Sequence, residues 1–107
     1  MDVAPPIRFA ELARLIGAAA RAAGLVVPVF RTPPRRSGIS RTIRRLPGGP
    51  VVAVRLRSRP IADVVADMVE GVIVANGLAS DVAGRVRETL LQAVGRAEAV
   101  GPESAAA

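Results

Sequence analysis

The sequence predicts an α+β fold made of a helix, a two-stranded antiparallel β-hairpin and then two helices, with the hairpin packed on the helices. Apolar residues recur at helical spacing before residue 24 and again after residue 60. Between these regions, two strand-like stretches flank Pro47-Gly48-Gly49-Pro50, a sequence typical of a tight turn. A chain of 107 residues is long enough for one core, so a single domain is expected.

An amphipathic helix is predicted over residues 9–23, at the start of this domain. Its apolar positions recur every three or four residues, and they are Phe9, Leu12, Leu15, Ile16, Ala19, Ala20 and Ala23. Charged residues occupy the opposite side, and Gly24 is placed to end the helix. We expect residues 1–8 to form an N-terminal arm before the domain, which spans residues 9–94.

The segment after the first helix is expected to be extended. Residues 25–30 form a short apolar run interrupted by Pro28, which favours an edge or a connector over a central strand. Residues 31–40 contain two prolines and a glycine, which disfavour helix, together with three arginines. This second segment is predicted to be a mobile basic loop.

A β-hairpin is predicted from two strands, residues 41–46 and 51–59. Successive side chains of a strand point to opposite faces. In the second strand the apolar face is formed by Val52, Val54 and Leu56, and the cationic face by Arg55, Arg57 and Arg59. These arginines would stand about 6.6 Å apart along the strand. Because a two-stranded hairpin alone is marginal in water, we expect it to lie on the helices or to extend its sheet across a dimer axis.

The central and most buried helix is predicted over residues 61–75, where nearly every residue is apolar or small. Pro60 suits the start of a helix, and Asn76-Gly77 suits its end. The polar exceptions are acids that fall within one narrow sector of the helix, and they are Asp63, Asp67 and Glu70. So much apolar surface is more than one thin domain covers readily, which predicts a homodimer.

A third helix is expected to begin at Ser80-Asp81, a pair that suits a helix N-terminus. Its apolar face is formed by Val82, Val86, Leu90 and Ala93. The tail over residues 95–107 is rich in Ala, Gly and Glu, and we expect it to be disordered.

The composition excludes several classes of functional site. The chain has no cysteine, histidine or lysine, so thiolate metal sites, disulfides and the usual general base are absent. We therefore expect a protein that is not an enzyme and that uses no cofactor and no metal. No apolar run approaches the roughly 18 residues of a spanning helix, so we expect no membrane span and a cytoplasmic location.

Arginine is concentrated in one part of the chain. Between residues 31 and 59 there are nine arginines and no acid, namely Arg31, Arg35, Arg36, Arg41, Arg44, Arg45, Arg55, Arg57 and Arg59. Guanidinium groups bind phosphate oxygens two at a time. Tryptophan and tyrosine are absent, so no platform for base stacking is expected. The sequence thus predicts a polyanion-binding protein that contacts the backbone of DNA or RNA without sequence specificity.

Other interpretations of the charges stay open. Residues 61–107 carry seven acids against three arginines, so the basic half could pair with this acidic half or with a second subunit. The basic half could also dock on an acidic partner protein, which would make the chain a protein-interaction module or small adaptor, or on other anions or a membrane surface. The acids of residues 61–75 could in principle hold Mg²⁺, but a solvated or ion-paired face is favoured.

Two blocks of the sequence stand out together, Phe30-Arg31-Thr32-Pro33-Pro34-Arg35 and Asp67-Met68-Val69-Glu70-Gly71-Val72-Ile73-Val74-Ala75-Asn76-Gly77-Leu78. On these blocks the chain resembles small basic proteins of G+C-rich, actinomycete-type bacteria, over roughly residues 9–94. The resemblance implies a bacterial cytoplasmic setting and does not imply an activity.

Overall fold

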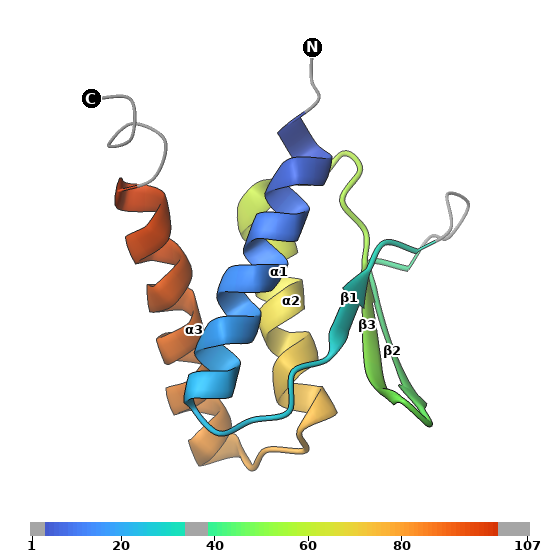
Figure 1. Cartoon of the computed structure of the whole chain (residues 1–107), viewed down its shortest axis with the longest axis vertical. Coiled ribbons are helices and arrows are strands. Elements are labelled where there is room, and N and C mark those ends of the chain that lie inside the picture. Colours follow the sequence, from blue (N-terminus) through green and yellow to red (C-terminus); the bar gives the residue numbers. More distant parts are fainter. Residues whose placement is uncertain (1–3, 34–38, 101–107) are drawn as a thin grey trace.

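The computed structural model describes residues 4–33 and 39–100 and shows an α+β fold (Figure 1). Three helices and three strands follow one another in the order α1 (Ala4–Ala22), β1 (Val29–Arg31), β2 (Arg41–Leu46), β3 (Gly49–Val54), α2 (Ile61–Ala75) and α3 (Ser80–Val100). The predicted α+β class and the order of helix, hairpin, helix and helix are confirmed.

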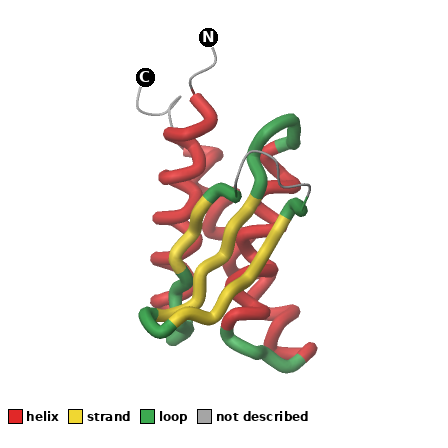
Figure 2. The backbone as a smooth tube through the Cα atoms, turned by 90° about the vertical axis from the view of Figure 1, so that its right-hand side faces the viewer, coloured by secondary structure: helices red, strands yellow, loops and turns green. Residues whose placement is uncertain are grey.

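The strands form one sheet in the order β1-β3-β2, and the helices cover only one of its faces. The helix α2 packs against β2 and β3, while α3 packs against α1 and α2 on the side farther from the sheet. Figure 2 shows the other face of the sheet, over which no helix of the described chain lies. The fold therefore leaves one face of the sheet open.

The predicted two-stranded hairpin is corrected to a three-stranded mixed sheet. β2 and β3 are antiparallel as expected, but β1 joins β3 in parallel, with Phe30 opposite Val52. The side chain of Asn76 helps to place this segment, because its Nδ2 donates to the carbonyl of Val26 and its Oδ1 accepts from the amide of Val26, each at 2.9 Å. The segment is thus an edge strand, one of the two alternatives predicted for it. Its pairing was not predicted, because the anchoring contact joins residues 50 positions apart.

The boundaries of several elements differ from the prediction. The second hairpin strand spans Gly49–Val54 and not residues 51–59. Beyond it the chain turns at Ser58, whose φ of 59° lies in the left-handed region. The expected N-terminal arm is helical from Ala4, and α3 continues to Val100, so residues 95–100 of the expected disordered tail are helical. The remaining tail, residues 101–107, and the loop residues 34–38 lie outside the described residues.

The core is built around α2, whose buried side chains face the other helices and the sheet. They are Val64, Val65, Met68, Val69, Val72 and Ile73. Leu12 and Ile16 of α1 and Leu90 of α3 cover this helix on one side, and Val52 and Val54 cover it on the other. Most of the apolar surface of α2 is thus covered within one chain, and the homodimer stays a prediction.

Gly71 sets the distance between α2 and the sheet. A Cβ atom at this position would lie 2.5 Å from Cγ1 of Val52, well inside van der Waals contact. The absence of a side chain at Gly71 thus lets the helix approach β3 closely. This approach brings Asp67 of α2 within reach of Arg41 from β2.

Both predicted glycine stops are confirmed. Gly77 has a φ of +60°, and its amide donates to Val74 while that of Leu78 donates to Ile73. Gly24 ends α1 in the same way, with a φ of +80°. In each case the left-handed glycine lets the next amides bond to the last carbonyls of the helix.

Within the described residues, none of the helices combines the length and the hydropathy needed to cross a bilayer.

Candidate nucleic-acid interface

The nine arginines predicted to bind nucleic acid do not form one surface. Arg35 and Arg36 lie outside the described residues. The other seven divide into arginines that are engaged inside the molecule and arginines that are exposed to solvent. The expected row on alternate strand positions is absent, because residues 55–59 follow the end of β3.

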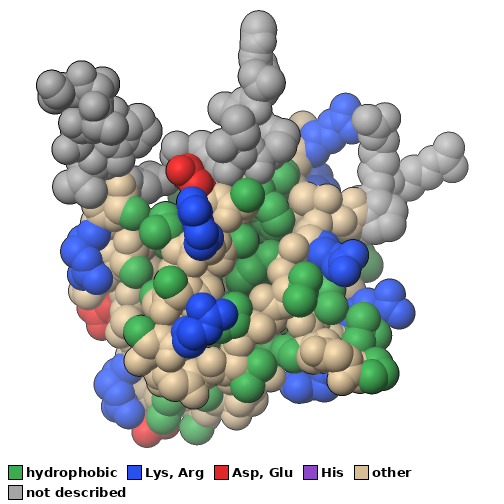
Figure 3. Space-filling model, in the orientation of Figure 1, with side chains coloured by type: hydrophobic (Ala, Val, Ile, Leu, Met, Phe, Trp, Pro, Cys, Tyr) green, Lys and Arg blue, Asp and Glu red, His purple; other side chains and the backbone are tan. Residues whose placement is uncertain are grey.

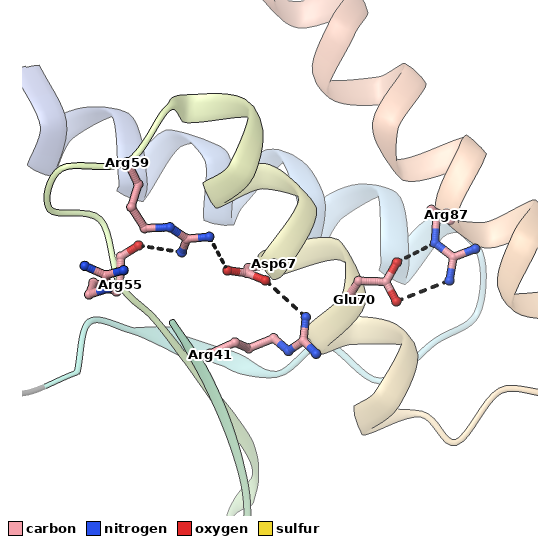
Figure 4. Close-up of polar contacts among 6 residues, drawn as sticks. All are labelled: Arg41, Arg55, Arg59, Asp67, Glu70 and Arg87. Atoms are coloured by element: carbon pink, nitrogen blue, oxygen red, sulfur yellow. Dashed lines mark hydrogen bonds and ion pairs between the residues drawn. The ribbon is translucent and has the colours of Figure 1, made fainter. Parts of the chain in front are cut away.

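Asp67 of α2 binds two of the predicted arginines (Figure 4). Its Oδ1 lies 3.1 Å from Nη1 of Arg41, and its Oδ2 lies 2.7 Å from Nη2 of Arg59. The side chains of Asp67 and Arg59 are only 15% and 13% exposed. The buried Oδ2 atom accepts no hydrogen bond of good geometry, so the close ion pair is its only compensation in the described structure. Pairing with the acidic half of the same fold, one of the interpretations left open, is confirmed for these two arginines.

Arg55 and Arg59 are linked through the main chain. Nη1 of Arg59 donates to the carbonyl of Arg55 at 3.0 Å, which is possible because the turn at Ser58 directs Arg59 back toward α2. Nε of Arg55 is buried and has no hydrogen-bond partner in the described part of the chain. The alternation expected for residues 55, 57 and 59 is thus replaced by a turn that separates their side chains.

Arg45 stabilises the end of α2. Its Nη1 and Nη2 donate to the carbonyls of Ala75 and Val74, each at 3.3 Å. The last carbonyls of a helix lack intrahelical partners, and a cation there also interacts favourably with the helix dipole. The last turn of α2 contains no basic residue of its own, so sequence analysis gave no sign of this role.

The three acids of α2 differ in their partners. Glu70 binds Arg87 of α3 through both carboxylate oxygens, while Asp63 is exposed. The hydrogen bond from Arg87 holds the pKa of Glu70 below its ordinary value, against the opposing effect of burial. No group of three metal-binding side chains occurs among residues 4–33 and 39–100.

The open face of the sheet carries the exposed arginines of the strands. Arg31 lies beside Ala53 in the register of β1 and β3, and Arg44 lies beside Val51 in that of β2 and β3. Residues directly opposite each other share a face, so Arg31 and Arg44 both belong to the face away from α2. Both are exposed, and neither forms an ion pair with a described residue. Arg57, in the turn after β3, is exposed in the same way.

Exposed apolar side chains accompany these arginines. Val29 and Leu46 lie on the same face and are 51% and 46% exposed. The strands contain no acid, and in Figure 3 the carboxylates that can be seen lie over the helices, whereas arginine side chains lie both over the helices and on the side of the sheet. We refer to Arg31, Arg44 and Arg57 as the exposed arginines.

No protein-family model matches this chain, and no curated protein or solved structure matches it either. The arrangement of the exposed arginines is therefore the main guide to function.

Proposed function

We propose that the protein binds the phosphate backbone of DNA or RNA through the open face of its sheet and the turn after β3. The observation that carries this proposal is the set of exposed arginines, which have no carboxylate partner in the described structure. Arg35 and Arg36 follow Arg31 in the sequence and would raise the number of possible phosphate contacts from three to five. Arg41, Arg45 and Arg59 are assigned instead to the fold.

The spacing of the exposed arginines supports contact with phosphates. Arg31 and Arg44 are two strands apart and offset by two residues along the strand, which separates their Cα atoms by about 12 Å. Long guanidinium side chains at this distance reach different phosphates of one backbone. Between them lie the small or branched residues Val51 and Ala53, which offer no aromatic ring for stacking. Binding is therefore led by phosphate contacts, which set affinity without reading the bases.

The salt dependence of binding tests this proposal. Three to five phosphate contacts predict a slope of about −3 to −4.5 in a plot of log affinity against log salt concentration on duplex DNA. Fluorescence anisotropy with a labelled duplex, and with single-stranded RNA of the same length, measures the slope. Affinity that is absent at low salt, or that does not change with salt, contradicts the proposal.

A pair of variants with equal loss of charge identifies the surface. Arg44→Ala with Arg57→Ala should reduce the magnitude of the slope by about 2. The control is Arg85→Ala with Arg96→Ala, two exposed arginines of α3 on the far side of the molecule. Both double variants should keep the melting temperature, because exposed cations contribute little to stability. Equal losses of affinity in the two variants would mean that net charge, and not this surface, controls binding.

A further inference from the structure

One long edge of the sheet is unpaired. The amide of Arg55 donates to the carbonyl of Ser40 at 2.9 Å, which fixes the hydrogen-bonding pattern between β2 and β3. Hydrogen-bonded and non-hydrogen-bonded residue pairs alternate along an antiparallel ladder. Residues 42, 44 and 46 therefore bond to β3, whereas residues 41, 43 and 45 direct their amide and carbonyl groups away from it. No other strand of the described chain pairs with this side of β2.

The arginines of this edge do not shield it. Charged side chains often protect an edge strand from pairing with another chain. Here the guanidinium of Arg41 is drawn to Asp67, and that of Arg45 is drawn to the carbonyl end of α2. Both side chains lean toward the helix layer and not across the free edge of β2. Arg44, on the open face, remains exposed beside them.

We propose that this edge binds an acidic peptide segment of a partner protein, which adds to the sheet as a fourth strand beside β2. Strand addition uses main-chain hydrogen bonds for affinity and side-chain chemistry for selection. The strand β2 contains no acid, and of its three cations only Arg44 has no partner within the described structure and stands exposed on the open face. An acidic strand complements this charge, whereas a second copy of β2 would place arginines beside arginines, and like charges across a strand pair are destabilising.

The length of the edge sets the length of the ligand. The six residues of β2 accommodate a segment of about six residues, roughly 20 Å long. On the open face, a carboxylate of this segment would bind Arg44. This site goes beyond the proposed nucleic-acid surface, because it uses the backbone of one edge and takes a protein ligand.

Methylation of peptide nitrogens provides a matched test. The probe is a labelled, end-capped heptapeptide of alternating glutamate and valine. In a strand, all the valine amides face one edge and all the glutamate amides face the other. Methylating the set that faces β2 should weaken binding by about tenfold or more, because roughly two or three main-chain hydrogen bonds are lost. Methylating the other set should leave the affinity nearly unchanged. Equal effects of the two modifications, or no binding by the unmodified peptide, would overturn the proposal.

Amide hydrogen exchange locates the ligand on the protein. The peptide should slow exchange at Ile43 and Arg45, which face the free edge, and should change little at Thr42 and Arg44, which already bond to β3. If the amides of Ile43 and Arg45 are protected in the protein alone, and sedimentation shows a dimer, a second copy of the chain occupies the edge. This result would overturn the proposal of an acidic peptide ligand. A nucleic acid that competes with the peptide and itself slows these two amides would also overturn it. The two proposals can fail separately. The Arg44→Ala, Arg57→Ala double variant tests only nucleic-acid binding, whereas the methylated peptides test the edge of β2 in the unaltered protein.

Discussion

The substitution Gly71→Ala tests whether the close approach of α2 to the sheet is structural. An added Cβ would lie 2.5, 3.0 and 3.3 Å from Cγ1, Cγ2 and Cβ of Val52, a residue with no exposed surface. Carbon atoms pack favourably at about 3.5–4.0 Å, so the helix and the strand must separate by close to 1 Å. Val52 has little freedom to rotate away, because branching at Cβ restricts its χ1 angle.

The expected cost follows from two opposing effects. Overpacking a tight core contact destabilises a protein by about 1–3 kcal/mol, and a stiff neighbour favours the upper part of this range. Replacing glycine by alanine within a helix stabilises by about 1 kcal/mol. The net loss at Gly71 should therefore be about 1–2 kcal/mol in the free energy of unfolding.

Gly84→Ala is the matched control for this measurement. Gly84 also lies within a helix, but it is exposed and an added Cβ would meet no atom within 4 Å. This variant should be more stable than the unaltered protein, because alanine has a higher helix propensity than glycine. Gly71→Ala has the same gain in helix propensity, so this gain cancels when the two variants are compared. Their difference in urea unfolding should be about 2–3 kcal/mol, or roughly 8 °C or more in melting temperature. Two equally stabilised variants would refute the close packing of Gly71 on Val52.

Three further predictions concern polar contacts of the fold. Asp67→Ala should lower the free energy of unfolding by about 2 kcal/mol, because it leaves the largely buried guanidinium of Arg59 without its carboxylate. The control is Asp63→Ala, at an exposed position of the same helix. An equal loss of stability in the two variants would contradict the role of the ion pairs. Asn76→Ala should lower the free energy of unfolding by about 1–2 kcal/mol, because the two hydrogen bonds to Val26 are lost. Amide hydrogen exchange should become faster in β1 than in β2. Unchanged exchange in β1 would argue against this anchor. The pKa of Glu70 is lowered in the folded state, so its pairing with Arg87 contributes stability that is fully present above the ordinary value of 4.5 and is lost as the pH falls through the folded pKa. Chemical unfolding of Glu70→Gln should accordingly differ from that of the unaltered protein at neutral pH and converge with it in acid, and a difference that does not depend on pH would exclude this linkage.

Much of the fold could be predicted because its signals are local. The helix of residues 61–75 is bounded by Pro60 and Asn76-Gly77, and the structure has the same limits. The strand Arg41–Leu46 was also predicted with its observed bounds, next to an unmistakable turn. The strand β1 was not assigned to the sheet, because three residues carry almost no period and its partner lies more than twenty residues away.

The candidate site was less predictable, because exposure of a charge depends on contacts between distant residues. A run of nine arginines in the sequence gives no indication that Asp67 takes two of them or that Arg45 closes the end of a helix. Strand alternation would have kept Arg55, Arg57 and Arg59 on one face, but β3 ends at Val54 and the left-handed residue Ser58 then turns the chain. Serine rarely signals such a conformation, so this turn could not be recognised from composition.

The contact between Asn76 and Val26 has a consequence for the order in which the protein folds. The hairpin of β2 and β3 closes a short loop, whereas this contact closes a loop of 50 residues and brings together the end of α1, β1 and α2. Closing a longer loop costs more chain entropy, so β1 should join the sheet after the barrier to folding has been crossed. Loss of the Asn76 side chain would then leave the folding rate almost unchanged and would accelerate unfolding instead.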